Sequence, residues 1–136
     1  MPHPRFALTV RPVLVEAIGT AFLLIAVVGS GIMGQQLSPD NTAVALLANS
    51  IATGAGLYVL IMLCAPTSRA HFNPLVTLAA ILNRDITGRV GGAYIGAQML
   101  GGIVGVMLTH AMFDAPILQT GTQDRASMGL WLSEVI

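Results

Sequence analysis

The sequence predicts an all-α membrane protein with three membrane-spanning helices and one re-entrant half-helix. Its 136 residues are 54% hydrophobic and only 9% charged, whereas soluble domains contain about 25% charged residues. The mean hydropathy is +0.78. Three apolar runs reach the length of about 20 residues that crosses a bilayer, and a fourth is about half as long. We expect residues 1–136 to form a single membrane domain.

The first apolar run covers residues 12–33 and contains the carboxyl group of Glu16. A secretory signal peptide is the alternative interpretation, but its apolar core is only about 7–15 residues long. An ionisable group inside a span indicates a functional site or a polar network. Glu16 is therefore a candidate site residue, and a headgroup contact near the start of the helix is its alternative role.

The second apolar run covers residues 43–63 and has no charged residue. A loop at residues 34–40 precedes it, and Asn41 or Thr42 is the expected N-cap. The third run covers residues 90–113. Small residues occur in it four positions apart, so they share one helix face and allow a neighbouring helix to approach closely; they are Ala93, Ala97, Gly101 and Gly105.

Between the second and third runs the apolar sequence breaks and then restarts. Pro66 and Arg69 interrupt it, and Asn73 and Pro74 open a short run that ends near Leu82. Asn is a favoured N-cap and Pro a favoured first helical residue. A helix of about nine residues is about 13 Å long, roughly half of a ~30 Å hydrocarbon core. Irregular backbone at membrane depth must line a cavity or be buried in protein, which indicates a pore or a solute site.

Residues 71–78, with the sequence HFNPLVTL, resemble the first Asn-Pro-Ala loop of the aquaporin and glycerol-facilitator channels, the major intrinsic protein family. Residues 16–23 (EAIGTAFL) resemble the first helix of that family, and residues 94–102 (YIGAQMLGG) resemble its third helix. The resemblance extends over residues 14–136. It implies one repeat of a fold that is built from two inverted repeats.

The end of the sequence is similar to its first helix. Residues 132–136 (LSEVI) match residues 14–18 (LVEAI), so that Glu134 stands where Glu16 stands. We expect a fourth helix to begin here and the rest of the second repeat to be missing. The missing half would come from a longer chain or from another polypeptide.

The resemblance also implies roles for the residues around the loop. Glu16 faces inward and supports the backbone of the re-entrant loop, and Gln98 matches the glutamine of the family's third helix. The carbonyl groups of Arg69, Ala70 and His71 form a ladder of hydrogen-bond acceptors in the inner half of the pore.

The beginning of the half-helix, formed by Asn73, Pro74 and Leu75, is the expected centre of the pore. A helix N-terminus carries roughly half a positive charge, and the Asn73 side-chain amide and free backbone amides can donate to a passing oxygen. Cations and protons are disfavoured at such a point, whereas water or a neutral hydroxylated solute is tolerated.

Thr53 lies at the position that contributes to the outer selectivity filter in the family. Water-selective members carry a bulky aromatic residue there, so a threonine implies a wider opening, suited to a polyol, urea-like or hydroxylated metalloid solute as well as water. The alternative is an ordinary span residue bonded to its own backbone.

Leu75 and Arg69 depart from the family pattern. Leu75 replaces a small alanine where two half-helices would meet, and Arg69 replaces a glycine, which permits backbone conformations that arginine takes less readily.

We therefore expect a passive channel for water or small uncharged solutes that requires a second half to conduct. The alternative is a non-conducting fragment or a membrane interaction subunit. We expect no enzyme activity, because the sequence has no Ser/His/Asp arrangement, no paired carboxylates in a span and no phosphate loop. We expect no cofactor and no metal, since His71 has no second ligand at a suitable spacing. No basic cluster indicates binding to nucleic acid.

The arginines predict the orientation, because cytoplasmic loops are enriched in cations. Three spans place the N-terminal segment and the link between the second and third spans on the same side, and these two regions hold five of the six arginines: Arg5, Arg11, Arg69, Arg84 and Arg89. We expect an integral protein of the plasma (cytoplasmic) membrane with a cytoplasmic N-terminus. Its expected partners are the lipid bilayer, the missing half and a small neutral solute, and the family implies a homotetramer.

Overall fold

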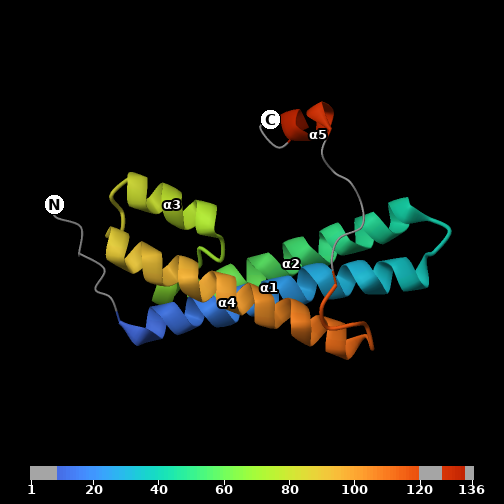
Figure 1. The fold of residues 1–136 in the computed structure, drawn as a ribbon, viewed down its shortest axis with the longest axis horizontal. Helices are drawn as coiled ribbons and strands as arrows, with labels where there is room; N and C mark the ends of the chain where they lie inside the picture. Colours follow the sequence, from blue (N-terminus) through green and yellow to red (C-terminus); the bar gives the residue numbers. More distant parts are fainter. Residues whose placement is uncertain (1–8, 120–126, 134–136) are drawn as a thin grey trace.

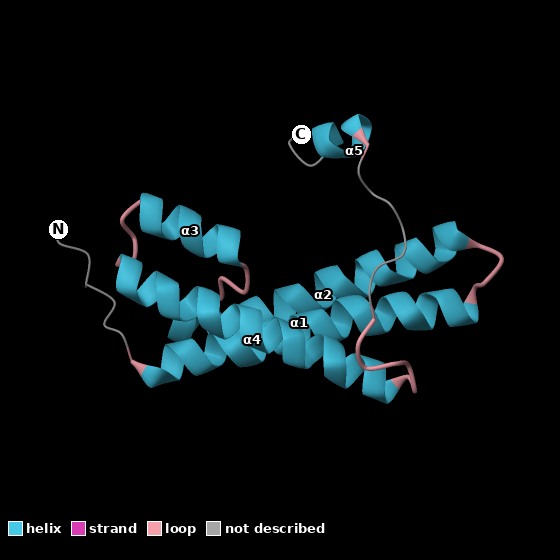
Figure 2. Cartoon of the chain, in the orientation of Figure 1, coloured by secondary structure: helices cyan, strands magenta, loops and turns pink. Residues whose placement is uncertain are grey.

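The computed structural model of the chain describes residues 9–119 and 127–133. Every regular element in these two ranges is an α-helix, as Figures 1 and 2 show: α1 (Val10–Leu37), α2 (Thr42–Ser68), α3 (Pro74–Leu82), α4 (Gly88–Met112) and α5 (Met128–Ser133). The all-α prediction is confirmed. The expectations that rest on Arg5 and Glu134 lie outside the described residues.

Three of the helices, α1, α2 and α4, are long and apolar enough to cross a membrane. They contain 28, 27 and 25 residues, which corresponds to lengths of about 37–42 Å. The three predicted spans are confirmed. The helices are longer than the ~30 Å hydrocarbon core, so their polar ends lie in the headgroup region or the helices tilt.

The predicted end of the first span at Met33 is wrong, because α1 continues to Leu37. The apolar pattern stops at Met33, but the helix continues against α2. Gly34 is buried there, and a Cβ atom added to it would lie 3.0 Å from the carbonyl oxygen of Ala45. The backbone N–H of Ser38 then donates to the carbonyl of Gly34 at 3.0 Å and closes the helix.

The expected interruption at Pro66 is also wrong, because α2 passes through Pro66 and ends at Ser68. Proline lacks an N–H group and disrupts a helix interior, but here it lies in the last turn. Arg69 ends the helix with a left-handed backbone (φ 73°), and its N–H donates to the carbonyl of Ala65 at 3.0 Å. At the other end Asn41 is the N-cap, and its side chain accepts a hydrogen bond from the N–H of Val44.

The short helix α3 covers Pro74–Leu82 as predicted, with Asn73 as its N-cap and Pro74 in the first turn. It lies beside the first half of α4, so that it begins midway along the bundle and ends near the start of α4 (Figure 1). A small apolar core fastens it there, formed by Ala80, Ile86, Val90 and Tyr94 with Val13 and Ile81 at its edge. This is the arrangement expected of a re-entrant half-helix.

The close approach predicted for the small-residue face of α4 is confirmed against α1. A Cβ atom added to Gly101 would overlap the backbone of Ala17, with the carbonyl carbon only 2.8 Å away. A Cβ atom added to Gly105 would meet the backbone of Ala21, with its Cα at 2.9 Å. Backbones that pack this closely bring Glu16 on α1 near Gln98 on α4, one turn before Gly101.

Candidate functional site

The carboxylate of Glu16 holds the loop that precedes α3. Its Oε1 accepts a hydrogen bond from the backbone N–H of His71 at 3.0 Å, and its Oε2 accepts one from the N–H of Phe72 at 2.8 Å. The Nε2 of Gln98 donates to the same Oε2 at 2.8 Å. Glu16 is fully buried and Gln98 is 1% exposed. One side chain of α1 therefore joins the loop to α4.

The loop backbone has an unusual conformation for its residue types. Arg69, Ala70 and Phe72 have φ angles of 73°, 52° and 48°, in the left-handed region that costs non-glycine residues roughly 1–2 kcal/mol each. The N–H of Ala70 donates to the hydroxyl of Ser68 at 3.0 Å, while the next two N–H groups bind Glu16. In the part of the chain that the structure describes, the carbonyls of Ala70 and His71 accept no hydrogen bond.

The ring of His71 is held on two sides. Its Nδ1 lies 3.1 Å from the hydroxyl oxygen of Thr77, and its ring meets that of Tyr94 edge-on with the centroids 5.6 Å apart. Thr77 and Tyr94 therefore fix the position of the imidazole ring.

Sequence reasoning missed four residues that complete this network. Thr77 is fully buried, and its hydroxyl oxygen accepts a hydrogen bond from the Nε2 of Gln98 at 2.9 Å. The hydroxyl of Tyr94 donates to the carbonyl of Ser68, the last residue of α2, at 3.1 Å. The ring of Phe72 is 3% exposed and fills the space that a Cβ atom on Gly19 would occupy.

A sequence signal was available for two of these residues. Gly19 lies three positions after Glu16, and Thr77 lies four positions after Asn73. Residues three or four apart share a helix face. Both residues could therefore have been placed on the faces that carry the site.

The beginning of α3 is exposed. The side-chain oxygen of Asn73 accepts a hydrogen bond from the N–H of Leu75 at 2.8 Å. The side-chain oxygen of Asn73 is therefore used to cap α3. Its NH₂ group can donate to a partner outside α3. Pro74 is half-buried, and the side chain of Leu75 is 73% exposed.

Two candidate residues lie apart from the Glu16 network. Thr53 is half-buried on α2, and its hydroxyl donates to the side-chain oxygen of Asn49 at 3.2 Å. Arg69 is exposed, and a guanidinium nitrogen lies 3.5 Å from the carbonyl oxygen of Asp85. Within residues 9–119 and 127–133, no three His, Cys, Asp or Glu side chains lie close enough together to bind a metal ion.

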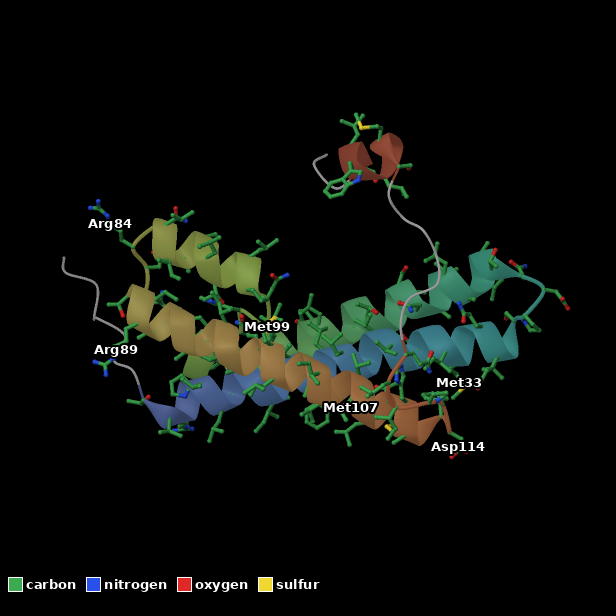
Figure 3. The ribbon with its side chains drawn as sticks, in the orientation of Figure 1. Met33, Arg84, Arg89, Met99, Met107 and Asp114 are labelled. Atoms are coloured by element: carbon green, nitrogen blue, oxygen red, sulfur yellow. The ribbon has the colours of Figure 1, made fainter. Side chains whose placement is uncertain are left out.

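An apolar groove begins at the N-terminus of α3 and continues beyond it. It has a volume of about 580 Å³ and runs between α1 and α4. Asn73 and Pro74 line one end, and the α4 side chains from Gln98 to His110 line its length. Figure 3 shows Met99 and Met107 along this part of α4.

Three helices of membrane-spanning length, with a braced half-length helix that starts midway along them, define an integral membrane protein of the re-entrant-loop class. The family model described as major intrinsic protein matches residues 5–133. The chain belongs to the major intrinsic protein family, which confirms the resemblance seen in the sequence.

Curated relatives agree with this assignment. The chain is 50% identical over 130 residues to the aquaglyceroporin AqpS of Rhizobium meliloti (strain 1021), a match that covers 96% of this chain and 55% of the relative. It is 38% identical over 129 residues to a probable TIP-type aquaporin of Medicago truncatula, covering 93% of this chain and 50% of the relative. The chain therefore spans about half the length of these relatives.

Proposed function

We propose that the chain contributes one half of a passive channel for water and small uncharged solutes. The observation that carries this proposal is the N-terminus of α3, which opens midway along the bundle. Beside it lie the carbonyls of Ala70 and His71, which accept no hydrogen bond from residues 9–119 and 127–133. A passing hydroxyl group can donate to these carbonyls. It can also accept from the Asn73 amide.

The electrostatics of this point favour neutral solutes. The positive end of the α3 dipole, roughly half an elementary charge, repels cations and protons at the middle of the membrane. Glu16 is fully buried and its oxygens accept hydrogen bonds from His71, Phe72 and Gln98, so it supports the loop backbone and is not itself an acceptor for the solute.

The groove beyond α3 supports the need for a second half. The α4 residues that line it, from Gln98 to His110, extend over about 18 Å of helix. A second half-helix as long as α3, about 13 Å, fits this length with its N-terminus facing Asn73. Such a half would be carried by the same longer chain or by another polypeptide.

Thr53 and the named relatives support a solute class wider than water. A threonine side chain at the outer filter leaves more space than an aromatic ring, and one relative is named an aquaglyceroporin. We propose a polyol, a urea-like solute or a hydroxylated metalloid in addition to water. The carbonyls of Arg69, Ala70 and His71 would bind the same solutes in the inner half of the pore.

We further propose that the N-terminus is cytoplasmic, in the plasma membrane, and that the completed channel is a tetramer like others of its family. Arg84 and Arg89 lie at the end of the bundle where α1 begins (Figure 3), and Arg11 belongs to the first turn of α1. Cations at one end of the bundle support a cytoplasmic position for that end.

Solute flux into proteoliposomes tests the proposal. The chain, completed by its second half, should accelerate water and glycerol entry without passing ions. An absence of flux above that of empty liposomes would favour the alternative, a non-conducting fragment or membrane interaction subunit.

The substitution Asn73→Asp should abolish solute flux in the completed channel or permit a cation leak. Aspartate caps a helix as well as asparagine does, and a negative charge is favourable at the N-terminus of α3, so the helix itself should remain. The added charge replaces an NH₂ donor with an acceptor and cancels the barrier to cations. Flux and membrane potential report the two outcomes, with circular dichroism as the control for folding. Unchanged selectivity would refute the role proposed for Asn73.

A further inference from the structure

We propose that Asn49 orients the hydroxyl group of Thr53. In this orientation the Thr53 oxygen acts as a hydrogen-bond acceptor at the outer opening of the channel. This acceptor binds neutral molecules through O–H or N–H donors, and we expect a polyol or urea-like solute, which fills more of the opening, to depend on it more than water does. This inference rests on the proposed function, in which Thr53 belongs to the outer filter. Asn49 is a positioning residue, because it acts on the solute only through Thr53.

Asn49 connects α2 to α1. Its Nδ2 donates to the backbone carbonyl of Val27 on α1 at 3.1 Å. The two helices leave a defined space for this amide, since a Cβ atom added to Gly31 would lie only 2.8 Å from the Nδ2 atom. The side chain is half-buried. The absence of a side chain at Gly31 therefore allows Asn49 to reach Val27.

The bond to Val27 determines which end of the amide faces Thr53. A backbone carbonyl can only accept a hydrogen bond, so the NH₂ end of Asn49 must point to it. The oxygen end, Oδ1, lies 3.2 Å from the hydroxyl oxygen of Thr53. Because Oδ1 is an acceptor only, the hydroxyl of Thr53 must donate its hydrogen to Asn49.

The hydroxyl group of Thr53 therefore has a fixed orientation. Once its hydrogen is committed to Asn49, the oxygen of Thr53 keeps lone pairs and can only accept from a solute. Polyols, urea-like molecules and undissociated hydroxylated acids offer the donors that such an oxygen requires. Without Asn49, the hydroxyl would bond the carbonyl four residues earlier in its own helix, as threonine does in helix interiors, and its lone pairs would point elsewhere.

The test compares the ratio of glycerol to water permeability in the completed channel, reconstituted in liposomes and followed by light scattering. Asn49→Leu removes both hydrogen bonds and keeps the branched shape of the side chain, and we expect the ratio to fall about three- to tenfold, the effect of one neutral hydrogen bond. Thr53→Val should lower the ratio by a similar factor. The double variant should be no worse than Thr53→Val alone, because Asn49 acts through Thr53.

A second variant keeps the inference testable if Asn49→Leu does not fold. Gly31→Ala displaces the Asn49 amide without removing a polar group, and we expect it to shift the ratio in the same direction. Ser50→Ala is the matched control, because Ser50 is an exposed neighbour on α2 whose hydroxyl donates to the carbonyl of Leu46 in its own helix. It should leave the ratio unchanged.

The possible failures are distinguishable. If Thr53→Val lowers the ratio and neither Asn49→Leu nor Gly31→Ala does, Thr53 is a filter residue that Asn49 does not orient, and the inference is wrong. Additive effects in the double variant would also overturn it. If Thr53→Val leaves the ratio unchanged while flux persists, Thr53 is not in the filter, and the inference is wrong although the channel proposal stands. A channel without flux in its unsubstituted form overturns both.

Discussion

Replacing Glu16 with leucine should destabilise the protein more than replacing any other polar side chain that contacts the loop before α3. The change leaves the N–H groups of His71 and Phe72 without their acceptor, and the Gln98 amide, which also donates to Thr77, loses one of its two acceptors. Each unsatisfied buried donor costs about 1–3 kcal/mol, so we expect a loss of about 3 kcal/mol or more. That is a large part of the stability of a typical domain, about 5–15 kcal/mol. Unfolding in detergent, followed by circular dichroism, measures the loss.

Two further variants make this result specific to the loop. Glu16→Gln keeps one acceptor oxygen but turns an NH₂ group toward other donors, so its stability should lie between the leucine variant and the original. Gln35→Leu makes a similar polar-to-apolar change at an exposed position near the other end of α1, and we expect an effect within about 0.5 kcal/mol. Equal unfolding midpoints for Glu16→Leu and Gln35→Leu would contradict the bracing role of Glu16.

Amide hydrogen exchange shows which part of the chain Glu16→Leu destabilises. The amides of His71 and Phe72 should be protected in the original chain and exchange much faster in Glu16→Leu, while amides within α2 remain protected. Slow exchange at both loop amides in the variant would show that another acceptor holds them.

The substitution Gly101→Ala should separate α1 from α4 even though it adds a single methyl group. The new Cβ atom would overlap the backbone of Ala17, and a backbone inside a helix cannot turn aside as a side chain can. Overpacking of this kind costs about 1–3 kcal/mol. The helices must move apart to accommodate it, which also lengthens the bond between Glu16 and Gln98. Thermal unfolding and the glycerol flux of the completed channel should both be reduced.

Gly96→Ala is the matched control on the same helix. No atom lies within 4 Å of the Cβ position of Gly96, so the added methyl group meets open space. Alanine favours a helix over glycine by up to about 1 kcal/mol, and this variant should be neutral or stabilising. Opposite signs for the two variants would establish that the α1–α4 contact, and not helix propensity, requires Gly101. A destabilisation of equal size at both positions would disprove it.

Local sequence patterns were sufficient to predict the helices of this protein. The lengths of the apolar runs predicted three spans, and the Asn-Pro pair predicted the start of α3 at Pro74. The four-residue spacing that includes Gly101 and Gly105 predicted the close helix contact. Each of these features lies within one continuous segment of the chain, so a linear sequence displays it directly.

The helix ends were predicted less well, for a physical reason. Hydropathy reports which residues favour lipid, whereas a helix ends where its backbone hydrogen bonds end. Residues 34–37 are helical although the apolar run is over, because Gly34 packs on Ala45. Pro66 is helical although it has no N–H group to donate to the preceding turn, and it lies in the last turn of α2, which ends at Ser68.

What the sequence by itself determined was the class of the protein, its family, its three spans and the half-helix with its N-cap. Only the tertiary structure decided how the loop is held. Glu16 binds residues 55 and 56 positions away, and Gln98 binds Glu16 across 82 positions. Such pairings depend on which helix faces meet, and the periodicity of one helix does not specify the rotation of its neighbour. The contact between Asn49 and Val27, which directs the hydroxyl of Thr53, is of the same kind.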